Sequence, residues 1–534
     1  MKKVEKKSKS KGIFINIIRL SMGASLLLLV MNACHSGPSC AERSLMLERM
    51  YVTTNPGNVK CDSLVNNTEE YDRIYENSFK DVQQNPLSTF SIDVDKASYS
   101  NIRRFLENGE LPPRDAVRIE EMINYFSYHY AQPDDEHPFA IHTEIGNCPW
   151  NKEHSLIKIG LQGKTLDYEH LKPSNLVFLI DVSGSMEDAN KLPLVKKSLK
   201  MMLENLQPTD RIALVVYAGA AGVVLPSTSI DQKDDIVSAI DKLTAGGSTA
   251  GGEGLELAYK IAKNDFIANG NNRVILCTDG DFNVGVSSTS EMVRFIEEKR
   301  KENIYLTICG FGMGNYKDGK LEQISNAGNG NYFYIDQEAE ANKVFVKELR
   351  ANMYTIAKDV KIQVEFNPEK VKAYRLIGYE NRVLANEDFN NDTKDAGELG
   401  AGHTVTALYE IVPVGASTPV NTTDPLKYQK NIKSEKAKTN ELVTIKFRYK
   451  PITSDISKLI VKTIVDTDGN KVSADFQFSA AVAEFGMLLR QSKYKGSADY
   501  KTVVSLAKDA LANETDKEKD EFIDLVEKAN SLSK

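Results

Sequence analysis

Ser174-Asn-Leu-Val-Phe-Leu-Ile-Asp181 is the most strand-like run of the chain, and Val182-Ser-Gly-Ser185 follows it directly. A short apolar run that ends in turn-forming residues predicts a buried strand of a parallel sheet. The carboxyl ends of such strands form the edge where open α/β sheets bind ligands. The sequence therefore places the carboxylate of Asp181 and the hydroxyls of Ser183 and Ser185 at a ligand-binding edge.

Strands and helices alternate from residue 171 to residue 350, which predicts an α/β domain with a doubly wound, mostly parallel sheet. The link Ala218–Gly222 is too short for a crossover helix, so we expect the strand that follows it to be antiparallel and at the sheet edge. The expected strands are 175–181, 211–217, 222–226, 273–279, 304–310 and 331–335. Expected helices follow the first strand and lie near 231–243, 251–266, 290–301 and 338–350.

Two more oxygen donors occupy the same kind of position. Thr249 lies in a glycine-rich loop before a helix, and Asp279 ends the strand that begins at Arg273. The complete donor set contains carboxylates and hydroxyls without His or Cys, which suits a small hard dication better than zinc. The sequence predicts a metal site for Mg²⁺, with Ca²⁺ or Mn²⁺ as alternatives, whose ligands are Asp181, Ser183, Ser185, Thr249 and Asp279. A polar turn without a metal is the competing interpretation.

Asp181-x-Ser183-x-Ser185, followed by Thr249 and by Asp279 in Thr-Asp-Gly-Asp, resembles the metal-ion-dependent adhesion site of von Willebrand factor type A domains. The resemblance implies that the hydroxyls ligate the ion, while the aspartates hold it directly or through water. It also implies one open coordination position that accepts a carboxylate from a partner protein, and a Rossmann-like fold with one reversed edge strand.

The segments outside the α/β domain resemble a family of bacterial envelope proteins in which a von Willebrand type A domain lies between N-terminal and C-terminal companion regions. The segments that carry this resemblance are Asn85–Asp95, Arg118–Phe126, Asp395–His403 and Phe485–Arg490. The resemblance covers the chain from residue 82 to its end, and it implies no substrate and no reaction.

Residues 1–33 are typical of a lipoprotein signal peptide. Seven basic residues precede the apolar stretch Leu26–Met31, which is too short to span a bilayer core of about 30 Å. Val30-Met-Asn-Ala-Cys34 resembles a bacterial lipobox, so we expect Cys34 to carry the lipid, with ordinary signal-peptidase cleavage as the alternative. The expected location is the cell envelope, on the periplasmic side of the outer membrane, with residues 34–81 as a tether.

The exported chain is acidic. Residues 1–33 hold seven of the 67 basic residues and one of the 74 acidic ones, so the remainder carries 60 basic and 73 acidic residues and a formal charge of −13. Nucleic acid is therefore a poor partner, because affinity for phosphates comes mainly from Lys and Arg.

Cysteine usage leaves disulfide connectivity open. Cys40 and Cys61 are candidates for a bridge in an oxidising envelope, Cys277 and Cys309 lie in apolar strand runs and are expected to be buried thiols, and Cys148 has no assignment.

The flanks of the α/β domain predict a β-sandwich and helices. Residues 356–478 show period-two alternation, and we expect the strands of 138–170 to join the same sandwich, so that the domain at 171–350 is inserted into it. Residues 82–137 are expected to form a helical module whose main helix begins at Asp115, and residues 479–534 to form C-terminal helices near 480–491 and 498–529.

The loop Asp388–Leu399 begins like a calcium-binding loop, with Asp388, Asn390 and Asp392 at alternate positions. Thr393 stands where such a loop needs glycine, and Leu399 stands where it needs a bidentate glutamate. We therefore expect a solvated acidic loop.

The function that this sequence favours is metal-dependent capture of an acidic residue on a partner protein by an envelope-anchored module. A metal-independent assembly scaffold and a metal-assisted hydrolase are the alternatives. Residues 171–350 contain no histidine, and although Asp281 and Glu253 lie near the expected ion, we expect no enzymatic activity.

Overall fold

The computed structural model describes residues 68–92, 95–167, 171–248, 251–280, 282, 289–422, 424, 427–428, 432–466, 471–512 and 515–534. The predicted signal peptide, Cys34, Cys40, Cys61, Thr249 and Asp281 lie outside these residues. Within the described part of the chain, no helix combines the length and apolar character needed to cross a membrane.

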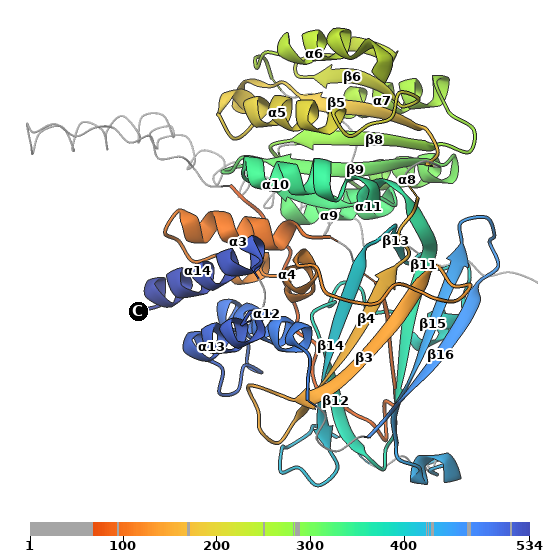
Figure 1. Ribbon diagram of the computed structural model, residues 1–534, viewed down its shortest axis with the longest axis vertical. Helices are drawn as coiled ribbons and strands as arrows, with labels where there is room; N and C mark the ends of the chain where they lie inside the picture. The colour runs from red at the N-terminus through yellow and green to blue at the C-terminus, as the bar shows by residue number, and fades with distance from the viewer. Residues whose placement is uncertain are drawn as a thin grey trace, which may run out of the picture. The chain divides into compact units, whose positions relative to one another are not determined.

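The α/β domain contains a six-stranded sheet in the order β10-β9-β8-β5-β6-β7 (Figure 1). Its strands are β5 (Ser174–Asp181), β6 (Arg211–Tyr217), β7 (Ala221–Ser229), β8 (Asn271–Thr278), β9 (Ile304–Phe311) and β10 (Tyr332–Ile335). Five of these strands are parallel, and β7 pairs antiparallel with β6 at the edge. The predicted reversed edge strand is therefore present.

Helices cover both faces of this sheet because its central strands are apolar on both faces. Leu176, Phe178 and Ile180 of β5 pack in one core cluster, while Val177 and Leu179 pack in a second cluster on the opposite face. The helices of this domain are α5 (Leu192–Leu203), α6 (Lys233–Asp241), α7 (Gly251–Asn264), α8 (Thr289–Lys301), α9 (Asp318–Ala327), α10 (Glu338–Asn342) and α11 (Leu349–Met353). A π-helical turn at Lys343–Lys347 separates the last two, which were expected as one helix at 338–350.

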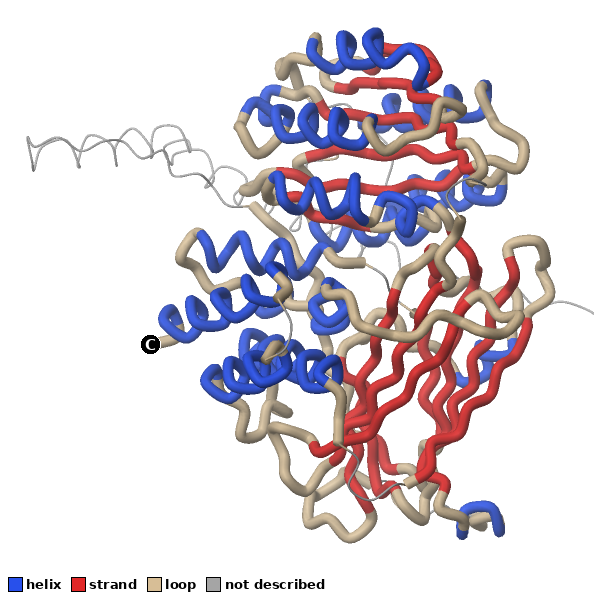
Figure 2. Tube along the Cα trace, in the orientation of Figure 1, coloured by secondary structure: helices blue, strands red, loops and turns tan. Residues whose placement is uncertain are grey.

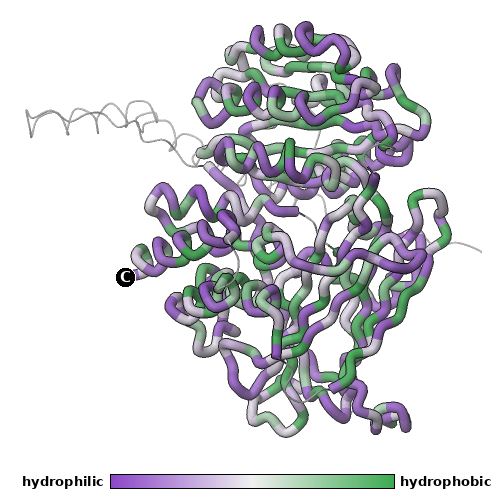
Figure 3. The backbone as a smooth tube through the Cα atoms, in the orientation of Figure 1, coloured by the Kyte–Doolittle hydropathy of each residue, from purple (hydrophilic) through white to green (hydrophobic). Residues whose placement is uncertain are grey.

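A β-sandwich lies beside this domain (Figures 1 and 2). One sheet has the order β1-β12-β14-β4-β3 and the other β13-β11-β15-β16, with β2 also paired to β11. The strands are β1 (Lys80–Asp81), β2 (Leu87–Ser91), β3 (Phe139–Asn147), β4 (Ser155–Gly163), β11 (Thr355–Phe366), β12 (Val371–Ile377), β13 (Gly397–Gly400), β14 (Thr404–Pro413), β15 (Glu441–Pro451) and β16 (Lys458–Val465). Apolar segments follow these strands in Figure 3 and form a single core between the sheets.

The sandwich is assembled from both sides of the α/β domain. β4 precedes that domain in the chain and β14 follows it, yet the two pair antiparallel over a register that runs from Thr404↔Gln162 to Ile411↔Ser155. The chain therefore leaves the sandwich after β4, forms the α/β domain and returns with β11. Together with the sheet order, this arrangement confirms the predicted fold class.

Helices from both ends of the described chain share a third core. They are α3 (Ala97–Glu107), α4 (Ile119–Tyr125), α12 (Ala474–Arg490), α13 (Tyr500–Ala510) and α14 (Lys517–Leu532). Phe126, Phe478 and Phe522 pack edge to face at ring-centroid distances of 4.9 to 5.7 Å. Helix α12 is buried along nearly its whole length, as expected for a helix with few polar positions.

Several boundaries differ from the sequence prediction. The helix expected from Asp115 begins at Ile119, because Arg114–Ala116 form a 3-10 turn and Val117 is extended. The module predicted at 82–137 is not purely helical, since strand β2 of this segment pairs with β11. The helix expected at 498–529 is two helices, α13 and α14.

Helix α3 was not predicted. Its buried face contains Asn101, Arg103 and Arg104, and such polar residues obscure a helical apolar stripe. These side chains are buried because partners from other elements satisfy them. Arg103 pairs with Asp336 at 2.6 Å and with Glu340 at 2.7 Å, both in the α/β domain.

Residues 68–81 were predicted to belong to the tether, but they pack on the folded unit. The Glu69 carboxylate pairs with Arg104 at 2.6 Å. The Asn77 side chain donates hydrogen bonds to the carbonyl oxygens of Leu376 and Gly378 at 3.2 and 2.8 Å.

A buried ion cluster joins the helical core to the α/β domain. The Arg118 guanidinium, directly before α4, contacts Glu121 in α4 and Asp318 at the start of α9, and it lies 3.7 Å from Glu322. Arg118 is 6 % exposed and Glu121 is fully buried. A single cation therefore balances carboxylates from two domains.

We expect Arg118→Met to lower the free energy of unfolding by about 3–5 kcal/mol, because it leaves buried carboxylates without a counterion. Denaturant unfolding measures the loss. Lys508→Met is the control, since Lys508 pairs with Glu527 at an exposed site and its removal is expected to cost less than about 1 kcal/mol. An equal, small effect of both substitutions would contradict the importance of the cluster.

A second stability prediction concerns Glu484 of α12. This residue is fully buried and neither carboxylate oxygen has a hydrogen bond of standard geometry, although the nearby Asp499 backbone N–H offsets part of the effect of burial. Burial, together with the charge of Asp499, raises the pKa of Glu484 to about 7. The protonated form is thus favoured in the folded state, so stability is highest at low pH and falls as pH rises from the ordinary pKa through about 7.

Glu484→Gln is therefore expected to remove this pH dependence and to raise the free energy of unfolding by up to about 3 kcal/mol at pH values above the shifted pKa. Near pH 4.5 the variant and the parent are expected to be equally stable. Unfolding curves across this range test the prediction, with the exposed Glu527→Gln as control. Parallel pH profiles for parent and variant would contradict it.

Candidate metal site at the carboxyl edge of the α/β sheet

Adjacent parallel strands bring two aspartates to the same edge. β5 and β8 are parallel neighbours, and their register includes the pair Ile180↔Cys277. Asp181 and Asp279 follow these paired residues at the carboxyl ends of the two strands, so they lie at the same edge of the sheet. Both residues have 0 % exposed surface. The apolar strands before them therefore fix two carboxylates where open α/β sheets bind ligands.

The turn after β5 adds two hydroxyls. The Ser183 backbone N–H donates to Asp181 Oδ1 at 2.8 Å, and this bond folds the chain back toward the carboxylate. Ser183 Oγ and Ser185 Oγ lie 3.1 Å apart. Ser183 is buried whereas Ser185 is exposed, so the group faces solvent on the side of Ser185.

The glycine-rich loop before Thr249 lies against this turn. Gly184 N donates to Gly247 O at 3.1 Å, and Gly246 N donates to Val182 O at 2.7 Å. Gly247 has a φ of +88°, which favours glycine. Thr249 is outside the described residues, but the loop that leads to it is held at the site.

Each aspartate keeps one enclosed oxygen without a partner. Asp181 Oδ2 and Asp279 Oδ1 are buried, and neither accepts a hydrogen bond of standard geometry from the described residues, although the buried Tyr217 hydroxyl lies close enough to Asp181 to favour its charged form. Buried polar atoms in proteins normally have a partner, so each exception requires an explanation. Burial raises the pKa of Asp181, and the nearby charge of Asp279 adds to this shift although Ser183 donates to the carboxylate. A site of this kind favours a bound cation.

A lysine that the sequence analysis missed completes the site. Lys191 Nζ lies 3.2 Å from Asp279 Oδ2 and donates to Ser185 O at 2.9 Å. The lysine is 6 % exposed, and its side chain passes over Gly312, where any Cβ would collide with it. The sequence contained one indication of this role, the position of Lys191 directly before α5. A cation is unfavourable at a helix N-terminus, so a lysine there is expected to have an acidic partner elsewhere.

Two further carboxylates and one acidic loop were the other candidates in the sequence. Glu253 is exposed on α7, and Asp281 lies outside the described residues. In the loop that resembles a calcium site, Arg448 donates to Asn390 Oδ1 at 3.2 Å and to Asp392 Oδ1 at 3.3 Å, so protein cations occupy those oxygens.

A second acidic group also has cations of its own. Ligand atoms of Asp95, Glu121 and Glu322 lie within 4.8 Å of one another. Arg118 contacts Glu121, and Arg382 lies 3.0 Å from Asp95, so this group is neutralised without a metal.

Cys277 and Cys309, expected as buried thiols, and the unassigned Cys148 all lie in the interior, as does a contact of His154. Cys148, Cys277 and Cys309 are buried free thiols. His154 Nδ1 lies 2.6 Å from Glu410 Oε1 in a buried ion cluster, and His142 Nε2 donates to Ala131 O at 3.0 Å.

Comparisons with known proteins assign the domains. Residues 175–349 match the family described as von Willebrand factor type A domain, residues 65–158 match one described as von Willebrand factor, and residues 351–532 match one described as Uncharacterized protein YfbK, C-terminal. The Uncharacterized protein YfbK of Escherichia coli K12 is 43 % identical over 474 residues, which cover 87 % of this chain and 82 % of that protein.

Two more distant similarities were found. The Uncharacterized protein sll0103 of Synechocystis is 28 % identical over 193 residues, covering 35 % of this chain and 44 % of that protein. A solved structure described as von Willebrand factor type A from Catenulispora acidiphila has a TM-score of 0.41 and 18 % identity, and the alignment covers 75 % of this chain and 91 % of that one.

The fold and the site define a von Willebrand factor type A protein with an inserted domain. The chain belongs to the family of the Escherichia coli protein YfbK. Domains of this type act in protein–protein interaction and commonly bind a metal ion at their adhesion site. The residues present here fit such an ion, since two enclosed aspartate oxygens lack a partner.

Lys191→Met tests the electrostatics of the site. Without a metal the substitution leaves Asp279 without its counterion, and we expect the free energy of unfolding to fall by about 1–3 kcal/mol. In Mg²⁺ the loss is expected to shrink, since a dication neutralises the same carboxylate and Lys191 no longer repels it.

Thermal unfolding in EDTA and in Mg²⁺ measures both effects, with the exposed Lys197→Met as control. A stability loss that is identical with and without Mg²⁺ would show that Lys191 does not face a metal site.

Proposed function

We propose that this protein is an envelope-anchored binding module that captures an acidic residue of a partner protein through a divalent metal. The proposed ligands are Asp181, Ser183, Ser185, Thr249 and Asp279. The observation that carries the proposal is the pair of enclosed, unpartnered oxygens, Asp181 Oδ2 and Asp279 Oδ1, on neighbouring strands.

The chain's own residues prepare the site before any partner arrives. The Ser183 N–H fixes the rotamer of Asp181, and Lys191 holds Asp279. The contact between Gly184 and Gly247 keeps the two loops together. Pre-positioned donors reduce the conformational entropy that metal binding would otherwise cost.

The donor set explains why the partner would be acidic. A bound dication supplies a positive field that hydroxyl ligands neutralise poorly, so a carboxylate from outside is attracted to it. The exposure of Ser185 leaves an approach from solvent. Exclusion of water at the interface strengthens the attraction, because Coulomb energy varies inversely with dielectric constant. Mg²⁺ is the preferred ion, and Ca²⁺ or Mn²⁺ suits the same oxygens.

The envelope location rests on the signal peptide and on Cys34. A lipid at Cys34 would hold the exported chain at a membrane, and we propose the periplasmic side of the outer membrane. We also propose that the module has no catalytic activity. The α/β domain lacks histidine, so no Ser–His or Cys–His pair can form within it.

Capture of envelope proteins by the full chain tests this function. In Mg²⁺ we expect the parent to retain a partner that is released by EDTA, and Ser185→Ala and Asp279→Asn to lower apparent affinity at least about tenfold, which corresponds to ~1.4 kcal/mol. Ser238→Ala is the matched control, since Ser238 is exposed on α6 and far from the site in the sheet order.

Three outcomes separate the alternatives. Retention in EDTA and by both site variants would favour a metal-independent scaffold. Hydrolysis of a peptide or phosphoester library that disappears in Asp279→Asn would favour an enzyme. Either result would contradict the proposed function.

A further inference from the structure

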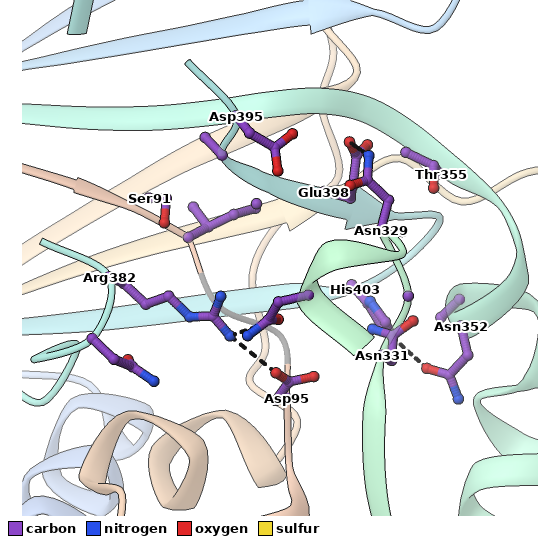
Figure 4. A pocket seen from close by; sticks show the side chains of 18 of the residues that line it. Ser91, Asp95, Asn329, Asn331, Asn352, Thr355, Arg382, Asp395, Glu398 and His403 are labelled. Carbon is purple, nitrogen blue, oxygen red and sulfur yellow. Dashed lines mark hydrogen bonds and ion pairs between the residues drawn. The ribbon is translucent and has the colours of Figure 1, made fainter. Parts of the chain in front are cut away.

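A polar cavity of about 220 Å³ lies where the α/β domain meets the sandwich (Figure 4). The α/β domain contributes Arg273 at the start of β8 and the turn Asn329–Asn331 before β10. The sandwich contributes Arg382, residues 395–398 and His403. The cavity lies at the amino end of β8, whereas the metal site lies beyond its carboxyl end, so the two are distinct.

Most charges around this cavity are already balanced. Arg382 pairs with Asp95 at 3.0 Å, and Arg300 pairs with Asp395 at 2.7 Å. Figure 4 shows the first of these contacts at the base of the cavity. Asn329 Nδ2 donates to Glu398 Oε1 at 2.8 Å and so links the two domains directly.

Arg273 is the exception on the α/β side. It is 3 % exposed, and no carboxylate among the described residues lies within ion-pair distance of it. Its one hydrogen bond goes to Thr307 Oγ1 at 2.6 Å, and its Nε–H has no acceptor. Burial lowers the pKa of Arg273 to about 10, which still leaves the group charged at neutral pH. The Tyr305 ring lies 5.7 Å from its guanidinium carbon and Glu398 attracts it from a greater distance, but no anion among the described residues contacts this buried cation.

On the sandwich side of the cavity, Glu398 and His403 each have a buried polar atom without a hydrogen-bond partner. Glu398 Oε2 is enclosed and has no donor, and burial together with the charges of Asp359 and Asp395 raises the pKa of Glu398. His403 is 6 % exposed, and burial lowers its pKa to about 4. Its Nε2 contacts Asn352 Oδ1 at 3.1 Å, so the neutral ring presents Nδ1 as an acceptor, and that atom has no donor.

These unpartnered groups define a complementary ligand. One side of the cavity offers a donor with positive charge, and the other side offers two acceptors, one of them a carboxyl group. The cavity is about seven times the ~30 Å³ that one water molecule occupies in the liquid, so it admits a small organic molecule. We propose that this cavity binds a zwitterionic α-amino acid, whose carboxylate contacts Arg273 and whose ammonium group contacts Glu398 and His403.

Such a ligand would bridge the α/β domain and the sandwich. Its binding would therefore stabilise the junction between the two domains. It would also supply hydrogen-bond partners to polar groups that are buried without any. This inference does not depend on the metal site or on its partner.

Thermal unfolding and calorimetric titration of the full chain with a panel of common L-amino acids test the proposal. EDTA is present throughout, so that no amino-acid carboxylate binds a metal ion. Sodium acetate and methylammonium chloride serve as probes for the two halves of the ligand. We expect at least one amino acid to raise the Tm by several degrees and to bind at least about tenfold more tightly than either half.

Glu398→Gln and Arg273→Met are each expected to abolish the shift, whereas Arg211→Met retains it, because Arg211 lies on β6 and bonds to Ser227 outside the cavity. If Arg273→Met fails to fold, the amino-acid binding of Glu398→Gln alone tests the proposal. No Tm shift with any amino acid at about 10 mM would overturn the proposal and indicate a water-filled cavity. Binding of acetate as tight as that of an amino acid, or unchanged binding by Glu398→Gln, would overturn it as well.

Discussion

The burial of two carboxylates at one edge of a parallel sheet is the constraint around which the α/β domain is organised. Asp181 and Asp279 have no exposed surface, and the apolar strands before them leave no freedom to move outward. An isolated buried carboxylate is costly, so the surroundings must supply donors or positive charge. Ser183 supplies a backbone donor to one and Lys191 an ammonium group to the other. One oxygen of each remains unsatisfied, and a metal ion would contact both.

The same problem recurs where the domains meet, and there the chain solves it internally. Arg118 balances carboxylates from α9 and from α4, and Arg103 pairs with Asp336 and Glu340. These contacts hold the inserted α/β domain against the helical core. The α/β domain is thus attached to its neighbours by buried ion pairs, whereas two ionisable groups at the junction cavity, Arg273 and Glu398, have no ion-pair partner among the described residues.

The parts of this structure that local sequence patterns encode were predictable. Period-two alternation identified strands such as β11 and β15, and the short link before β7 identified its reversed direction. The position of Asp181, Ser183 and Ser185 at the end of an apolar strand run placed those side chains at the carboxyl edge of the sheet. The role of these residues as metal ligands stays a prediction.

The parts that depend on distant partners were not predictable. Helix α3 buries Arg103, whose carboxylate partners are more than 230 positions away, so its sequence lacks an ordinary apolar stripe. Lys191 was missed for a similar reason, since its partner Asp279 is 88 positions along the chain. The cavity beside Arg273 exists only after β4 and β11 have brought the two domains together.

Crystals soaked in Mn²⁺ and measured at the manganese absorption edge would test the central claim most directly, because anomalous scattering locates the ion without assumptions about its ligands. The account predicts one strong peak between Asp181, Ser183, Ser185 and Asp279, with the ammonium group of Lys191 displaced from Asp279. A map with no peak among these residues, or with its strongest peak elsewhere in the chain, would contradict the assignment of this edge as a metal site.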